Sequence, residues 1–130
     1  MKTWATGLVA LGGFVLLGTE LQAHHAVASV YDLNTEVVLE GRLTKLNYRN
    51  PHANLLLEVP NEDGTTTEWT LTTASTQVLG RAGVTRDSMQ PGEIFRITIL
   101  PARNGNPAGF IRTLELGDRA VELFFRDRPN

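Results

Sequence analysis

The 130-residue sequence contains no cysteine, so disulfide bonds, thiolate metal sites and cysteine nucleophiles are all excluded. Neither sign of charge predominates, because 12 basic and 14 acidic residues leave a formal net charge of −2. Nucleic-acid-binding proteins usually carry a basic face, and proteins that bind anionic lipid carry a polybasic patch. The charge balance provides neither feature, and we expect no nucleic-acid partner.

Enzyme motifs are also missing from the sequence. No serine lies in a Gly-x-Ser-x-Gly elbow, and there is neither a phosphate-binding loop nor a dinucleotide fingerprint. The length suits one domain of ordinary size rather than two. We therefore expect a single domain that is not an enzyme.

The apolar run near the start, residues 5–17 (ATGLVALGGFVLL), is too short to cross a membrane. A spanning helix needs about 20 apolar residues, and this run is also interrupted by glycines. Lys2 supplies a positive start, and a polar segment with a small residue follows, as in a cleavable secretory signal. We predict a signal peptide over residues 1–23, a mature domain over residues 24–130, and a periplasmic or secreted protein without a membrane span. An uncleaved membrane anchor is the alternative.

Two peptide bonds are candidates for the cut that removes this signal. A cut after Ala23 makes His24 the first residue of the mature protein. A cut after Ala28 fits the small-x-small pattern of cleavage sites better, but it lies unusually far beyond the apolar run and would discard both His24 and His25. We favour the cut after Ala23.

Most of the mature chain alternates apolar and polar residues, as strands do. One helix is expected over residues 75–83, where Ser75 can cap the start and Gly83 can end it. Strands are expected over residues 36–48, 53–60, 65–73, 93–100 and 110–116, with a short sixth strand over residues 120–125.

The first expected strand changes phase along its length. Its apolar positions alternate as far as Leu43 and then move to Leu46, which predicts a bulge or a sharp bend. Gly41, in the middle of this strand, allows strong coiling.

A three-residue loop over residues 62–64 sets the register of the second and third strands. It pairs Leu57 with Trp69, which places Trp69 in the core, and leaves Glu58 opposite Glu68 on the outside.

Five strands with a helix between the third and the fourth is the element order of an OB-like barrel. A bent first strand also fits, because one strand must serve both sheets of a small barrel. We predict an all-β fold, a small OB-like barrel of five to six strands with one short helix between strands 3 and 4. A β-sandwich is the alternative.

Several segments together resemble a known family: HHAVASVYD after the signal, VLEGRLTKLNYRNPHANLLLEV, EWTL and VLGRAGVTRDSMQPGEIFRI. They are similar to domain-of-unknown-function family 6152, a family of small exported bacterial proteins. The resemblance implies export and compact β structure, but no activity. The matching residues are His24, His25, Gly41, Asn50, Pro51, His52, Trp69, Arg81, Gly83, Pro91 and Gly92. The chain departs from the pattern at Ala26, at Glu93 and after His52, where the usual aromatic residue is missing.

All three histidines of the chain lie near the start of the mature domain, and they are the candidate metal ligands. After a cut at Ala23, the α-amine and the imidazole of His24 can chelate one metal ion, and further imidazoles from His25 and His52 would give a nitrogen-rich set that suits Cu(II). The competing interpretation is a solvated tail and a His52 that bonds its own turn.

Two loops form a second candidate site. In an OB-like barrel the loops after the first and fourth strands lie beside the ligand face. Here they carry Arg49, Asn50 and Arg103, which predicts a site for a small polar or anionic ligand. Ordinary turn chemistry is the alternative.

The sequence as a whole favours a non-enzymatic binding module of the bacterial envelope, with copper as its candidate ligand. A structural or protein-interaction domain without a metal is the alternative. A copper redox enzyme that uses a histidine brace is a third and weaker hypothesis.

Overall fold

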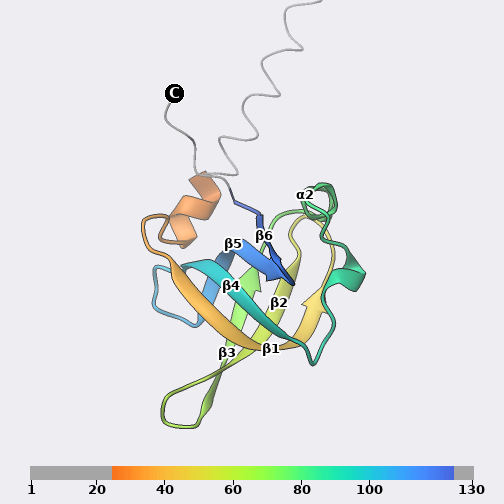
Figure 1. Cartoon of the computed structure of the whole chain (residues 1–130). Helices are drawn as coiled ribbons and strands as arrows, with labels where there is room; N and C mark the ends of the chain where they lie inside the picture. The colour runs from red at the N-terminus through yellow and green to blue at the C-terminus, as the bar shows by residue number, and fades with distance from the viewer. Residues whose placement is uncertain (1–24, 125–130) are drawn as a thin grey trace, which may run out of the picture.

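The structure, a computed structural model, describes residues 25–124 (Figure 1). A short helix over residues 25–30 comes first. The predicted signal peptide and His24 lie outside the described residues. The other elements are β1 (Val37–Asn47), β2 (Asn54–Pro60), β3 (Thr66–Thr72), α2 (Thr76–Arg81), the 3-10 helix η1 (Arg86–Ser88), β4 (Ile94–Pro101), β5 (Ala108–Leu116) and β6 (Arg119–Glu122).

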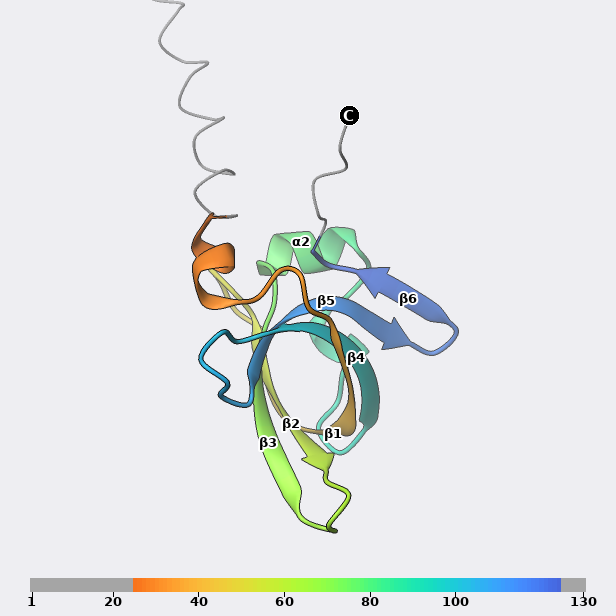
Figure 2. The ribbon, with the colours of Figure 1, turned by 90° about the vertical axis from the view of Figure 1, so that its left-hand side faces the viewer.

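Five of the strands form a closed barrel. β1 pairs antiparallel with both β2 and β4, β2 pairs with β3, and β4 pairs with β5. The barrel closes where β3 and β5 run parallel, at Thr70–Thr72 beside residues 108–110. β6 is an extra strand that pairs with the second half of β5. The predicted OB-like barrel is therefore confirmed, with its helix α2 between the third and fourth strands (Figures 1 and 2).

The two ends of the barrel differ. Figure 2 shows α2 lying across one end, next to the helix over residues 25–30, while the β2–β3 hairpin extends from the opposite end. The described part of the chain also starts and stops at the α2 end in both views. This end therefore brings together segments that are far apart in the sequence.

The β2–β3 hairpin has the predicted register. Leu57 pairs with Trp69, and Glu58 pairs with Glu68 on the exposed face. Gly64 ends the three-residue loop with φ +85°, a conformation that favours glycine. The expectation that Trp69 is a core residue is only partly right: its side chain packs against the core but is half-buried, because the hairpin extends past the end of the barrel.

The predicted irregularity in the first strand is a β-bulge. The pairing of β1 with β2 shifts between Leu43 and Lys45, so that the strand can turn from one side of the barrel to the other. Gly41 lies just before this bulge, where a Cβ atom would overlap the backbone carbonyl of Glu58. The glycine is therefore required by the close approach of two strands.

Helix α2 also begins and ends as predicted. The Ser75 side chain accepts a hydrogen bond from the Val78 amide at 3.4 Å, and Gly83 follows the helix with φ +76°. Leu79 is buried in the barrel core, whereas its neighbour Val78 is 39% exposed. Val78 instead faces the pocket described below.

The last two strands differ slightly from the prediction. β5 begins two residues earlier, at Ala108, because this segment pairs with β3 and the Thr70 amide bonds the Pro107 carbonyl at 3.0 Å. β6 ends at Glu122, earlier than predicted, because the amides of Leu123 and Phe124 turn back to the Arg112 carbonyl.

Candidate ligand pocket outside the barrel

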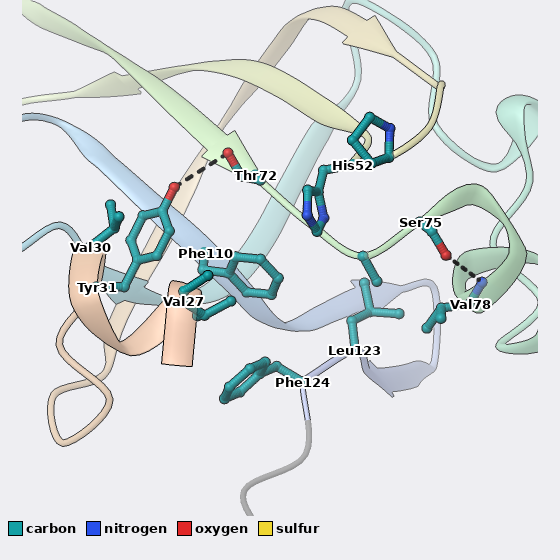
Figure 3. A pocket seen from close by; sticks show the side chains of 13 residues that line it. Val27, Val30, Tyr31, His52, Thr72, Ser75, Val78, Phe110, Leu123 and Phe124 are labelled. Carbon is teal, nitrogen blue, oxygen red and sulfur yellow. Dashed lines mark hydrogen bonds between the residues drawn. The ribbon is translucent and has the colours of Figure 1, made fainter. Parts of the chain in front are cut away.

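A pocket of about 570 Å³ lies on the outside of the barrel at the α2 end. It is formed by five segments: the helix over residues 25–30 with the following Tyr31, the β1–β2 loop, the segment from the end of β3 into α2, β5 and the residues after β6. Apolar side chains make up most of its wall, among them Val27, Val30, Val78, Leu123 and Phe124 (Figure 3). This volume is in the range of small-molecule sites in proteins.

Phe110 is the centre of the pocket wall. Its neighbour Ile111 belongs to the barrel core, so Phe110 points to the outer face of the barrel, since successive strand residues face opposite sides. It is nevertheless only 5% exposed. Three rings contact it edge to face, at centroid distances of 5.7 Å (Tyr31), 6.4 Å (His52) and 5.4 Å (Phe124). Such contacts each add about 0.5–1.5 kcal/mol beyond the area they bury.

The helix over residues 25–30 is held against the barrel by the β4–β5 loop. The Arg103 side chain donates from Nε to the Ala28 carbonyl, and its backbone amide donates to the Val30 carbonyl, both at 2.9 Å. Tyr31 then pairs with Ala102 in an isolated bridge. These bonds fix the position of the pocket's outer wall.

His52 lines the pocket from the β1–β2 loop, with its ring pointing toward Phe110 (Figure 3). Its Nδ1 lies 3.1 Å from the Thr73 carbonyl oxygen. A carbonyl can only accept a hydrogen bond, so Nδ1 carries the proton and Nε2 of the neutral ring carries a lone pair. Nε2 has no hydrogen-bond partner within residues 25–124, which leaves this lone pair available to a ligand.

The pocket wall contains no charged side chain among the described residues, apart from the titratable His52. Its other polar groups are hydroxyls that already have partners: the Tyr31 hydroxyl bonds Thr72 at 3.4 Å, and Ser75 caps α2. The wall therefore has no group that would neutralise a fully charged ligand.

The rim of the pocket exposes apolar surface. Four large apolar side chains are exposed among the described residues: Val30, Val38, Val78 and Ile94. Two of them, Val30 and Val78, lie on this pocket, on segments far apart in the sequence. Clustered apolar exposure of this kind is typical of a binding site.

The predicted metal ligands are only partly placed. His24 lies outside the described residues, and His25 is exposed at the start of the first helix. Ala26, the next residue, lines the same pocket as His52, so the start of the described chain and the β1–β2 loop meet there. No three His, Cys, Asp or Glu residues within residues 25–124 form a group that could hold a metal ion.

None of the three predicted loop residues lines the pocket, and two of them serve other contacts. Asn50 accepts bonds through Oδ1 from the amide and the hydroxyl of Thr76, which ties the β1–β2 loop to α2. Arg103 holds the first helix, as described above. Arg49 is exposed on the β1–β2 loop. The two loops thus hold α2 and the first helix in place around the pocket. Their predicted residues do not themselves offer side chains to a ligand in the pocket.

The sequence interpretation missed the aromatic part of the pocket, namely Tyr31, Phe110 and Phe124. One signal was present: Phe110 and Ile111 are adjacent large apolar residues in a strand, which indicates that both faces of the strand are covered. Which segments cover the outer face depends on contacts between distant parts of the chain.

No helix within residues 25–124 is both long and apolar enough to span a membrane.

Residues 13–112 match a family of unknown function, DUF6152. The match begins within the apolar N-terminal segment and ends in β5, so it includes the first four barrel strands and most of the pocket. No curated protein and no solved structure matches the chain. Because the match covers most of the sequence, the chain belongs to the DUF6152 family of proteins of unknown function.

Proposed function

We propose that this protein is a non-enzymatic binding module, exported to the periplasm or beyond, that binds a small, mainly apolar ligand in the pocket beside Phe110. The observation that carries the proposal is the pocket itself, about 570 Å³ in volume and walled by apolar and aromatic side chains from five segments. A few polar groups on an otherwise apolar wall are what small-ligand sites usually offer.

The packing around the pocket supports this function. Phe110 is buried although it points away from the barrel core, because Tyr31, His52 and Phe124 surround it. The edge-to-face contacts of these three rings with Phe110 form a firm wall, and a preformed site costs less ordering free energy when a ligand binds.

The test measures binding of Nile red, a neutral dye that fluoresces in apolar surroundings, to the processed protein recovered after export. We expect the Val30→Asp variant to bind the dye about tenfold more weakly, because a carboxylate in the pocket wall would have to be desolvated. Val38→Asp is the matched control: Val38 is 50% exposed and Val30 51%, but Val38 does not line the pocket.

Equal dye affinity in the two aspartate variants would overturn the proposed pocket function. Absence of any dye binding would do the same, and would leave copper binding and a structural or protein-interaction domain as the remaining interpretations.

Copper binding is a second candidate function, favoured by one specific observation. His52 donates from Nδ1 to the Thr73 carbonyl and keeps Nε2 free, which is the arrangement by which metal-binding histidines are commonly oriented. Ala26 lines the same pocket, so a mature chain that starts at His24 begins only two residues before the pocket wall. The α-amine and the imidazoles are chemically suited to Cu(II).

Titration of the processed protein with Cu(II), by calorimetry and EPR, tests this second function, after its intact mass has fixed the cleavage site. We expect nitrogen-dominated coordination that is weakened in the His24→Ala and His52→Ala variants. Binding no tighter than that of free histidine, or a cut after Ala28, would rule it out.

A further inference from the structure

We infer that the preferred ligand of this pocket is a neutral aromatic molecule that carries a hydrogen-bond donor, such as a phenol. This inference rests on the proposed pocket function and names its ligand class. It follows from three features of the pocket wall: a fixed acceptor, an aromatic surface and the lack of charge.

The fixed acceptor is Nε2 of His52. The Thr73 carbonyl holds the proton on Nδ1 at 3.1 Å, so the neutral ring presents a lone pair at its other nitrogen. The remaining polar side chains of the wall, Tyr31, Thr72 and Ser75, are already engaged with each other or with α2. A ligand that donates one hydrogen bond therefore matches the group that the pocket leaves unpaired.

The aromatic surface comes from Phe110 and the rings around it. The planes of Tyr31, His52 and Phe124 are inclined to the plane of Phe110 by 62°, 79° and 67°. Aromatic rings prefer such edge-to-face arrangements or offset stacking. A flat ring that enters the pocket would extend the same packing, whereas a flexible chain would lose more conformational entropy for similar contact.

The lack of charge excludes the ionic alternatives. No Lys, Arg, Asp or Glu is present among the described lining residues. A carboxylate would therefore meet the Nε2 lone pair of the neutral His52 ring instead of a donor, and an ammonium group would gain one hydrogen bond there but no opposite charge to offset its lost hydration. Neutral ligands avoid this cost.

Three naphthalenes of nearly equal size test the inference in displacement of Nile red from the wild-type protein: naphthalene, 2-methoxynaphthalene and 2-naphthol. Only 2-naphthol can donate a hydrogen bond. We expect it to bind about 3- to 10-fold more tightly than 2-methoxynaphthalene, as for one net hydrogen bond.

The His52→Phe variant keeps a ring against Phe110 but removes both ring nitrogens. We expect it to abolish the advantage of 2-naphthol over 2-methoxynaphthalene, measured as the ratio of the two affinities within the variant. Because the wild-type series alone measures the donor preference, the inference stays testable even if this variant folds poorly.

Equal affinity for 2-naphthol and 2-methoxynaphthalene would overturn the donor preference, and binding of Nile red without any of the naphthalenes would overturn the aromatic preference. In both cases the pocket function itself would stand. Failure of every probe, Nile red included, would overturn the pocket function as well.

Discussion

The His52 ring lies edge-on to the Phe110 ring, with 6.4 Å between their centroids and 79° between their planes. His52 belongs to the β1–β2 loop and Phe110 to β5, so the two residues are not joined by the strand pairing of the barrel. This contact places the one free polar nitrogen of the described pocket wall, Nε2 of His52, beside the aromatic surface of Phe110.

Phe110→Ala is expected to lower the free energy of unfolding by about 3 kcal/mol. The ring is buried and touches three others, so truncation leaves a void on the outer face of the barrel. Urea denaturation measures the change. Phe110→Leu, which keeps most of the volume, should cost clearly less. A loss below about 1 kcal/mol for the alanine variant would show that the aromatic cluster does not contribute to stability.

Gly41→Ala is expected to destabilise the fold by about 1–3 kcal/mol, because the new methyl group would overlap the backbone of Glu58, which cannot move without opening the β1–β2 pairing. Gly80→Ala in α2 is the matched control. Its methyl group meets no atom within 4 Å and should stabilise the helix by about 0.5–1 kcal/mol. Thermal unfolding of the two variants should therefore shift in opposite directions; a shift in the same direction would contradict the predicted strand clash.

Arg103→Ala is expected to loosen the helix over residues 25–30 without unfolding the barrel. The variant loses the bond from Nε to the Ala28 carbonyl, so the amides of Tyr31 and Asp32, bonded to Val27 and Pro101, should exchange with deuterium several-fold faster.

Two controls distinguish local loosening of the first helix from global destabilisation of the protein. The amides of α2 should exchange at unchanged rates in Arg103→Ala, since no bond to that helix is lost. Arg49→Ala, a change of an exposed arginine on the other loop, should leave the amides of residues 31–32 unaffected. Uniformly faster exchange would point to global destabilisation instead.

Asp63 is expected to titrate below its ordinary value. The Thr65 hydroxyl and then the Thr65 amide donate hydrogen bonds to the carboxylate, and these bonds lower the pKa of Asp63 from 3.8. Because the pKa of Asp63 is lower in the folded state, its ionised carboxylate stabilises the fold at pH values above the unfolded-state pKa. This stabilisation is lost as the pH falls through the folded-state pKa.

Thr65→Val removes the hydroxyl, the larger cause of the shift, and keeps the backbone bond. NMR titration of the Asp63 carboxyl carbon should then show its pKa moving back toward 3.8. An unchanged titration curve would show that the hydroxyl does not cause the lowered pKa.

Much of the fold could be predicted from local patterns. The hairpin register followed from the length of one loop that ends in Gly64, and the β1 bulge followed from a change of apolar phase at Leu43. The ends of α2 followed from Ser75 and Gly83. In each case neighbours in the sequence determine the conformation through backbone geometry, so the prediction needs no knowledge of distant contacts.

The candidate site could be predicted only in part. His52 was singled out as a rare chemical group at a turn, and it does line the pocket. Arg103 was assigned to ligand binding, but it holds the first helix. The role of a polar loop residue depends on which segment of the chain lies next to it. Tertiary packing determines that neighbour, and the local sequence does not.

The sequence by itself thus determined the strands, the turns, the barrel class, the near balance of charge and the lack of known catalytic motifs, because each depends on composition or on near neighbours. Only the tertiary structure decided that Phe110 is buried outside the barrel, that Ala26 and His52 share one pocket, and which nitrogen of His52 stays free. Barrel closure between β3 and β5 brings these distant segments to one end of the molecule, and no local pattern encodes which side chains then meet.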